Sequence, residues 1–450
     1  MADTSVLIVG GGFAGVACAR HLARHDIDVI LLDRNNYHQF QPMLYQVATA
    51  QVAAYDIARP LRGIFRRDKT VEVRRTPVVA IDPANRSVTT ASGTLLTGDH
   101  LVVAAGAQAN FFGTPGAAEH TFPLYSVPDA ERLRAHLVDI LDATVNRPDR
   151  ADDGSLNFVI VGGGPTGVET AGALAETIRD VVPDRYAPLA GRAQVHLVER
   201  GDVLLAPFSA KAHAYAADRL AHDGVVLHLG VGVQEVRHDR VVLTDGTEID
   251  TRTVVWGGGE KPADVVAASG LRTGHGGRID VRRDLTAGGL PRVFVLGDAA
   301  NIPDAHGRVL PQLGSVAQQS GAWAARNIHD SLAGKEGKDF KYRDKGIMAM
   351  IGRNAAVAEM GPHRHEVEGP VAFAAWLGVH AALLSGVRSR IDAFVDWGWD
   401  YFSKNRATAV VDGPAATRID WGHEDDDEPP DLDHHPGSPR AGEDARSAGP

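Results

Sequence analysis

Two segments of the chain share one pattern of apolar and polar positions. Each opens on a short apolar run, Ser5–Val9 or Asn157–Val161, and continues into a glycine turn, Gly10–Gly15 or Gly162–Gly167. An apolar helix and a second apolar run follow each turn. Short apolar runs of this kind are typical of strands buried in a parallel sheet. Each segment therefore predicts a βαβ unit.

Further apolar runs indicate where the two sheets are completed. Strands are expected at 101–104, 253–256 and 293–296. The segment 234–249 is expected to form a hairpin that turns at Asp245-Gly246. A polar loop is expected at 145–156.

These elements predict an α/β fold with two Rossmann-like dinucleotide-binding domains, the second inserted in the first. The first domain is expected to comprise residues 1–115 and 286–340, and the second residues 116–285. Residues 341–410 are expected to form a C-terminal amphipathic helical extension, and 411–450 a disordered acidic tail.

The C-terminal extension contains two pieces of different polarity. Residues 371–384 are almost wholly apolar, whereas 387–402 alternate apolar side chains with charges and carry two tryptophans. Neither piece reaches the roughly 20 apolar residues that a membrane-spanning helix needs. We expect helices that lie in the plane of a membrane surface. The alternative is that these helices pack on the nucleotide domains or in a homodimer interface.

Charge and cysteine content exclude several classes of function. The net charge of −11 argues against nucleic acid as a partner. Cys18 is the single cysteine, so the chain offers no CxxC redox pair and no cysteine-based metal site. No metal site is expected, and the paired His434 and His435 are interpreted as part of a solvated tail. No secretory signal precedes the first strand, so a cytoplasmic chain is expected.

The first glycine turn has the spacing of a dinucleotide-binding fingerprint. Gly10, Gly12 and Gly15 stand between a strand and a helix, and Asp33 ends the next strand. Glycines at such a turn let a pyrophosphate approach backbone N–H groups at the positive end of the helix. The carboxylate of Asp33 can accept hydrogen bonds from ribose hydroxyls.

The second turn repeats this design with Gly162, Gly164 and Gly167, and Glu199 ends the following strand. A carboxylate at that point binds a free 2′-hydroxyl and repels a 2′-phosphate, which favours NADH over NADPH. The neighbouring Arg200 could accommodate a phosphate, which acts against this preference.

Two fingerprints joined to the segment 293–300 resemble the two-dinucleotide-domain flavoprotein superfamily. The resemblance implies that the first fingerprint holds FAD and the second NADH, and that Gly297-Asp298 contacts the FAD from the far end of the sequence. The site residues that it implies, besides the glycines and acids above, are Phe13, Ala14, Arg34, His38, Gln41, Val79, Ala105, Gly106, Thr166 and Gly258.

Within that superfamily, four local stretches resemble the type II NADH:quinone oxidoreductases. They lie at 36–49, 56–62, 310–321 and 376–380 and extend the resemblance to about residue 402. The resemblance implies hydride transfer from NADH to FAD and two-electron reduction of a membrane quinone, without proton pumping. Disulfide reductases and sulfide:quinone reductases are disfavoured because one cysteine cannot form their redox pair.

The resemblance also suggests two catalytic residues. Gln319 matches a position that lines the quinone pocket, although it could be a helix glutamine satisfied by the backbone. Glu169 matches a glutamate near the nicotinamide, although it could instead stabilise the first helical turn through the macrodipole. The sequence departs from the family pattern at Gly314-Ser315 and at Gly257–Glu260. Both departures bear on the electron acceptor.

The expected location is the cytoplasmic side of the plasma membrane, as a peripheral protein that contacts the inner face through its C-terminal helices. Two other functions stay open at this point. One is a soluble NADH-dependent flavoprotein reductase with a protein or small-molecule acceptor, and the other is a redox sensor that turns over slowly. The sequence does not identify the quinone.

Overall fold

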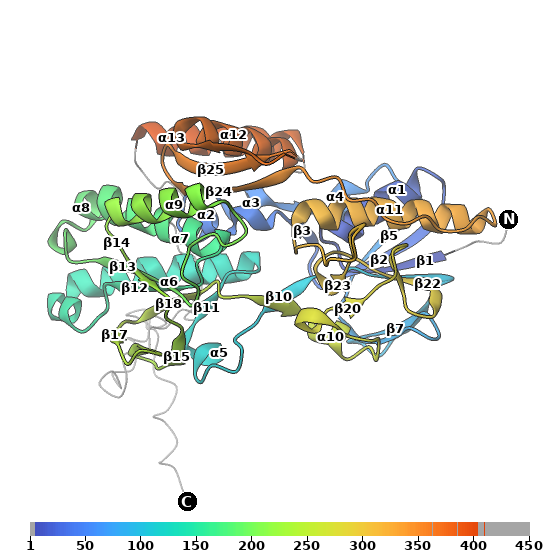
Figure 1. Ribbon diagram of the computed structural model, residues 1–450, viewed down its shortest axis with the longest axis horizontal. Coiled ribbons are helices and arrows are strands. Elements are labelled where there is room, and N and C mark those ends of the chain that lie inside the picture. Colours follow the sequence, from blue (N-terminus) through green and yellow to red (C-terminus); the bar gives the residue numbers. More distant parts are fainter. Residues whose placement is uncertain (1–4, 362, 385, 404–408, 410–450) are drawn as a thin grey trace, which may run out of the picture.

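The computed structural model describes residues 5–361, 363–384, 386–403 and 409 of the chain. The acidic tail expected at 411–450, with His434 and His435, lies outside the described residues. Figure 1 shows two sheet-containing halves side by side, with the C-terminal strands and helices along one side.

The first sheet unites strands from both ends of the chain. Its order is β21-β22-β9-β1-β2-β5, and all neighbours are parallel except β21 and β22. Because β22 pairs with β9 although every strand of the second sheet lies between them in sequence, the predicted insertion of the second domain in the first is confirmed. The strands are β1 (Ser5–Val9), β2 (Asp28–Asp33), β5 (Val71–Arg75), β9 (His100–Val103), β21 (Thr286–Ala287) and β22 (Leu290–Val295).

Two helices pack closely together beside this sheet. They are α1 (Phe13–Ala23), which follows the first glycine turn, and α11 (Gly314–Leu332). A Cβ at Gly321 would lie 2.1 Å from the carbonyl oxygen of Ala14, so the helices can approach this closely only because Gly321 has no side chain.

The second sheet is entirely parallel, with the order β11-β18-β12-β13-β14. Its strands are β11 (Phe122–Pro123), β12 (Asn157–Val161), β13 (Gln194–Glu199), β14 (Val225–Leu229) and β18 (Thr253–Trp256). Its main helices are α6 (Val127–Asn146), α7 (Pro165–Glu176) and α9 (Ala210–His222). Strands β10 (Ala107–Ala109) and β19 (Glu260–Pro262) pair antiparallel where the chain crosses between the two halves.

Local expectations were met in part. The expected hairpin is confirmed as β16 (Arg240–Leu243) and β17 (Glu248–Asp250), with Asp245-Gly246 between them, and β15 (Val233–Val236) adds a third antiparallel strand. The expected polar loop holds the end of α6 and a 3-10 helix at Pro148–Asp152. The antiparallel sheet of β6 (Val78–Asp82), β7 (Ser87–Thr90) and β8 (Leu95–Thr97) was not predicted from the sequence.

Short elements connect these parts. They are β3 (Tyr37–Gln39), β4 (Ala58–Pro60), β20 (Ile279–Asp280), β23 (Ala300–Asn301), α2 (Leu44–Ala48), α3 (Ala54–Ile57), α4 (Leu61–Ile64), α5 (Ala117–His120), α8 (Val182–Arg185) and α10 (Asp264–Ala267).

The C-terminal extension has its own antiparallel sheet, which the sequence analysis missed. It consists of β24 (Gly346–Gly352), β25 (Ala355–Met360) and β26 (His365–Glu368), followed by the predicted helices α12 (Gly369–Leu383) and α13 (Val387–Ser403). A Cβ at Gly172 of α7 would lie 1.7 Å from the carbonyl oxygen of Ile351, so β24 packs directly on α7. The side chain of Trp376 is fully buried in a core shared with α2, α6 and α7.

The two C-terminal helices are therefore packed on one side and exposed on the other. Trp376 and Trp397 face inward, whereas large apolar side chains on the outer side are exposed, among them Val371, Leu383, Ile391, Val395 and Trp399. Among the described residues, no helix is long and apolar enough to cross a membrane.

Candidate functional site

The two glycine turns have the same backbone geometry. Gly10 and Gly162 adopt φ values of 104° and 106°, which other residues rarely adopt. A Cβ at Gly15 would lie 1.8 Å from the carbonyl oxygen of Gly10, and a Cβ at Gly167 would lie 1.8 Å from that of Gly162. Both turns therefore require glycine at their first and last positions, independently of any ligand.

The acids that end β2 and β13 hold these turns in the same way. Asp33 accepts N–H bonds from Gly11 at 2.6 Å and from Asn35 at 2.7 Å. Glu199 accepts N–H bonds from Gly163 and Gly201, each at 2.6 Å. Burial raises the pKa of Asp33, and its two backbone N–H donors act against that rise. Each carboxylate thus orients its glycine turn at the carboxyl edge of a parallel sheet, where ligands of such sheets bind.

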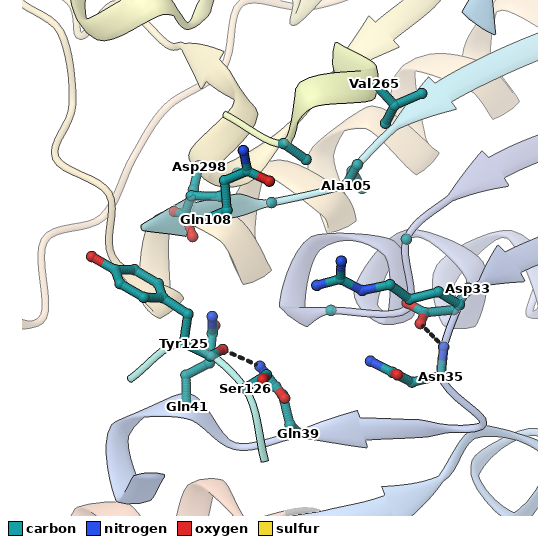
Figure 2. Close-up of a pocket in the computed structure, with 18 of the residues that line it drawn as sticks. Asp33, Asn35, Gln39, Gln41, Ala105, Gln108, Tyr125, Ser126, Val265 and Asp298 are labelled. Atoms are coloured by element: carbon teal, nitrogen blue, oxygen red, sulfur yellow. Dashed lines mark hydrogen bonds between the residues drawn. The ribbon is translucent and has the colours of Figure 1, made fainter. Parts of the chain in front are cut away.

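The first turn opens on a cavity of about 1050 Å³, here called the cofactor cavity. Figure 2 shows side chains from several elements around it, with Asp33 and Asn35 on one side and Tyr125 and Asp298 on another. Its lining residues lie in the segments 9–14, 32–35, 76–78, 104–113, 123–129 and 296–298. Other lining residues include Gln39, Gln41 and Ala317.

The residues of the cofactor cavity fit an FAD. Gly12 caps the N-terminus of α1 without any side-chain hydrogen bond, and a Cβ there would meet nothing within 4 Å. Its position leaves room for a phosphate at the positive end of the helix. Across the cavity, the Oδ1 atom of Asp298 is buried and has no hydrogen-bond partner among the described residues. A buried unpaired acceptor is costly, so a hydroxyl-bearing ligand would stabilise it.

Most residues predicted to bind FAD line this cavity. They are Gly10, Gly12, Phe13, Ala14, Asp33, Arg34, Gln41, Ala105, Gly106, Gly297 and Asp298.

Three predicted residues do not line it. Gly15 acts through close packing, as described above. His38 is buried behind the turn, where its Nδ1 lies 3.0 Å from the carbonyl oxygen of Gly11 and its ring packs edge-on against Phe13. Val79 is exposed because strand residues alternate between faces, and its neighbour Val78 lines the cavity instead.

The residues predicted to bind NADH gather at the carboxyl ends of β12, β13 and β18. Gly162 and Gly164 follow β12, Glu199 ends β13, and Gly258 follows β18 with Val161 and Trp256 beside it. Thr166 is exposed in the first turn of α7. The structure therefore brings these residues together at one edge of the second sheet, and their binding of NADH stays a prediction.

A second cavity, of about 330 Å³, lies beneath the C-terminal helices and is here called the C-terminal cavity. Most of its lining is apolar and aromatic, and its polar side chains come from Gln46, Gln51, Glu169, Glu176 and Arg353. The apolar and small lining residues are Tyr45, Ala173, Met350, Gly352, Phe373, Leu377, Phe394, Trp397, Gly398 and Tyr401.

Glu169 reaches the C-terminal cavity from α7. It is buried, and its Oε1 accepts the N–H of Met350 at 3.1 Å. Burial raises the pKa of Glu169 to about 8, and the Met350 N–H acts in the opposite direction. The raised pKa favours the protonated carboxyl, which can donate a hydrogen bond. The contact with Met350 also ties α7 to β24, which is a structural role for this side chain.

Gln319 lies elsewhere. Its Nε2 donates to the carbonyl oxygen of Arg343 at 3.0 Å, and its Oε1 accepts the N–H of Arg343 at 3.0 Å. It lines neither of the two cavities. The structure thus favours the alternative in which the backbone satisfies this glutamine, and the side chain ties α11 to the segment before β24.

Sequence reasoning missed the remaining polar residues of the C-terminal cavity. Gln46 lies in the stretch 36–49 that carries the family resemblance, and that was the one available signal. No signal in the sequence marks Gln51, Glu176 and Arg353, because they lie on segments that are far apart in sequence and meet only in the folded chain.

Comparisons with known proteins agree with this geometry. Residues 4–321 match the family described as pyridine nucleotide-disulphide oxidoreductase. A type II NADH:quinone oxidoreductase of Mycobacterium tuberculosis is 34% identical over 422 residues, which cover 90% of each chain. The mitochondrial internal alternative NAD(P)H-ubiquinone oxidoreductase A1 of Arabidopsis thaliana is 30% identical, over 92% of this chain and 85% of its own.

Solved structures share the fold. NDH2 of Plasmodium falciparum in complex with NADH superposes with a TM-score of 0.81 at 16% identity, over 89% of this chain and 98% of its own. The sulfide:quinone oxidoreductase of Aquifex aeolicus gives a TM-score of 0.70 at 19% identity, over 89% of this chain and 96% of its own. The chain belongs to the type II NADH:quinone oxidoreductases, within the pyridine nucleotide-disulphide oxidoreductase family.

Proposed function

We propose that this enzyme reduces its quinone in the C-terminal cavity, while α12 and α13 rest on the cytoplasmic face of the plasma membrane. FAD, when bound in the cofactor cavity, would supply the chemistry of this activity, which is hydride transfer from NADH and two-electron reduction of quinone without proton pumping. One observation supports these positions for the quinone and the membrane. The helices that close the C-terminal cavity are the same helices that expose apolar side chains outward.

The lining of the C-terminal cavity suits a quinone head group. Ligand sites are mostly apolar with a few placed polar groups, and this cavity has aromatic walls from Tyr45, Phe394 and Trp397. A quinone carbonyl needs hydrogen-bond donors. The protonated carboxyl of Glu169 supplies one, and we assign it the further role of giving its proton to a quinone oxygen during reduction.

The outer faces of α12 and α13 suit a membrane surface. Val371, Ile391 and Val395 expose 69%, 57% and 62% of their surfaces, and Trp399 is exposed beside them. Apolar side chains with tryptophan at the polar boundary are typical of helices that lie in the membrane interface. A soluble acceptor would not require this surface, so we favour a membrane quinone over the alternative of a soluble reductase.

NADH is the preferred nucleotide in this proposal. The Oε2 atom of Glu199 accepts the N–H of Gly163 in the second glycine turn, and its Oε1 atom accepts the N–H of Gly201. These bonds fix the carboxylate at the end of β13, where dinucleotide-binding folds bind the ribose hydroxyls. A 2′-phosphate there would meet a fixed negative charge.

Filling the C-terminal cavity tests the proposal. Ala173→Phe and Leu377→Trp each add bulk to its lining, and Ala214→Phe adds the same bulk to an exposed position of α9 as the control. We expect both cavity variants to lose quinone reductase activity by about tenfold or more, with NADH-to-ferricyanide activity kept. Equal quinone activity in all three variants would show that quinone binds elsewhere. Slow turnover of the unmodified enzyme with every quinone would instead favour a redox sensor.

A further inference from the structure

The side chain of Gln46 is held between two aromatic residues inside the protein. Its Oε1 atom accepts the indole N–H of Trp397 at 2.9 Å, and its Nε2 atom donates to the hydroxyl oxygen of Tyr45 at 3.0 Å. Gln46 is only 2% exposed, and all three residues line the C-terminal cavity. The backbone of Gln46 is fixed as well, because its carbonyl oxygen accepts the N–H of Gln51 at 2.7 Å.

The bond from Trp397 determines which way the Gln46 amide is turned. An indole N–H can donate a hydrogen bond but cannot accept one, so the amide atom that faces Trp397 must be the oxygen. The amide nitrogen therefore faces Tyr45, whose hydroxyl oxygen accepts one of its two hydrogens. Among the residues that the structure describes, no acceptor takes the second hydrogen. Gln46 can thus donate one further hydrogen bond to a ligand of the cavity.

Other polar groups of the C-terminal cavity are engaged within the protein. Glu176 accepts the backbone N–H of Arg353, and the Arg353 guanidinium donates to the carbonyl oxygen of Tyr401 at 3.4 Å. Glu169 reaches the cavity from α7, whereas Gln46 reaches it from α2. A buried N–H that lacks an acceptor is costly, so a ligand that brings an acceptor oxygen to Gln46 is stabilised there.

We propose that Gln46 is a quinone-binding residue, whose second amide hydrogen is donated to a carbonyl oxygen of the quinone, and that Trp397 is the positioning residue that orients this amide. The proposal rests on quinone reduction in the C-terminal cavity. It adds a donor to the carboxyl of Glu169, so that side chains from two different helices can bind one head group with two carbonyl oxygens. Gln46 makes and breaks no covalent bond in this role.

The test is steady-state quinone reduction by the holoenzyme with a short-tailed benzoquinone, which requires no membrane. Gln46→Met keeps the length of the side chain and removes the amide. We expect the KM for quinone to rise by about fivefold or more, and kcat to change by less than about twofold, because the bond is made when the substrate binds. NADH-to-ferricyanide activity should be kept. Gln234→Met, at an exposed position of β15, should behave like the unmodified enzyme.

A double-mutant cycle tests the role of Trp397. Trp397→Phe keeps an aromatic ring and removes the N–H that orients the amide. We expect this substitution alone to raise the KM for quinone by about threefold or more. In the Gln46→Met background it should raise the KM by less than about twofold, because no amide remains to be oriented. Equal effects in the two backgrounds would overturn the positioning role.

Infrared spectroscopy separates quinone binding by Gln46 from a structural role. A hydrogen bond lowers the stretching frequency of a carbonyl group, so a carbonyl band of bound, isotope-labelled quinone should lie at higher frequency in Gln46→Met than in the unmodified holoenzyme. Where Gln46→Met does not fold, Trp397→Phe replaces it, with a shift in the same direction. An unshifted band would overturn the proposal. An equal loss of ferricyanide and quinone activity would overturn it too, because it would assign Gln46 a structural role.

Failure of this proposal can be distinguished from failure of the proposed function. Loss of quinone activity in Ala173→Phe and Leu377→Trp, with an unchanged KM in Gln46→Met, would place quinone in the C-terminal cavity without a bond to Gln46. Unchanged activity in both cavity variants would show that quinone binds elsewhere, and both proposals would then be wrong.

Discussion

The indole N–H of Trp397 donates to Oε1 of Gln46 at 2.9 Å, across 351 positions of sequence. Gln46 belongs to α2, which packs against α6 and α7 of the second dinucleotide domain, and Trp397 belongs to α13 of the extension. Both residues line the C-terminal cavity. The C-terminal extension therefore supplies lining residues of the C-terminal cavity as well as an exposed outer surface.

Trp397→Phe removes this hydrogen bond and leaves Oε1 of Gln46 without the donor. We expect a loss of about 1–3 kcal/mol in the free energy of unfolding, together with faster amide hydrogen exchange in α13. Val395→Ala, at an exposed position of the same helix, should change stability by no more than about 0.5 kcal/mol. Equal effects of the two substitutions would mean that the bond does not hold the helix.

Close packing of the extension on α7 can be tested at a glycine. Gly172→Ala would place a Cβ 1.7 Å from the carbonyl oxygen of Ile351, so α7 and β24 must separate. We expect a cost of about 1–3 kcal/mol or more in denaturant unfolding. Gly378→Ala in α12 meets nothing within 4 Å, and it should instead stabilise the protein by up to about 1 kcal/mol. A neutral Gly172→Ala would contradict the close contact.

Two substitutions in the first glycine turn distinguish an effect on FAD binding from an effect on folding. Gly12→Val has space for its side chain in the flavin-free protein but occupies the phosphate position. We expect near-normal melting of the flavin-free protein and FAD binding weakened by about tenfold or more. In Gly15→Ala the added Cβ clashes with the carbonyl oxygen of Gly10, so both the melting temperature and the FAD affinity should fall. Flavin content and thermal melting distinguish the two results, and full FAD content in Gly12→Val would place the diphosphate elsewhere.

Glu199 sets the nucleotide preference. We expect kcat/KM for NADH to exceed that for NADPH by about tenfold or more, which corresponds to about 1.4 kcal/mol or more. Glu199→Gln should narrow this ratio because it removes the charge that repels the 2′-phosphate, while keeping an acceptor for one backbone N–H. Steady-state kinetics with both nucleotides measure the ratio. An unchanged ratio in Glu199→Gln would show that another part of the site sets the preference.

The two dinucleotide domains could be predicted because their signals are local. An apolar strand, three glycines and an acid at the end of the next strand all lie within one βαβ unit, so Gly10, Gly15 and Asp33 could be identified from spacing alone. The inserted topology followed from the apolar run that became β22. Val79 was misplaced by one residue, which in a strand reverses the direction of the side chain.

The C-terminal cavity could not be predicted from spacing. It forms where α2, α7, β24, α12 and α13 meet, and no pattern within one segment records such a meeting. The strands β24 and β25 are rich in alanine and methionine, which gives little β-propensity to recognise. Gln319 was predicted by resemblance to line a quinone pocket, and its two hydrogen bonds in the structure go to the backbone of Arg343, which carries no side-chain signal.

Truncation after Pro370 is an unsuitable test of membrane binding, because it would remove the buried side chains of Trp376 and Trp397 from the core. Surface substitutions avoid this problem. The triple substitution of Val371, Ile391 and Val395 by serine changes only exposed positions of α12 and α13. Serine at Leu95, Val226 and Leu332 provides a matched control on other exposed surfaces.

The most direct test is the reoxidation of NADH-reduced enzyme by a long-tailed quinone embedded in lipid vesicles, followed by flavin absorbance in a stopped-flow instrument. We expect NADH to reduce the α12–α13 serine variant at the normal rate. We expect its reoxidation by quinone to be slower by about tenfold or more. The control variant should match the unmodified enzyme in both steps. Reoxidation of the α12–α13 variant at the normal rate would contradict quinone reduction at a membrane surface formed by these helices.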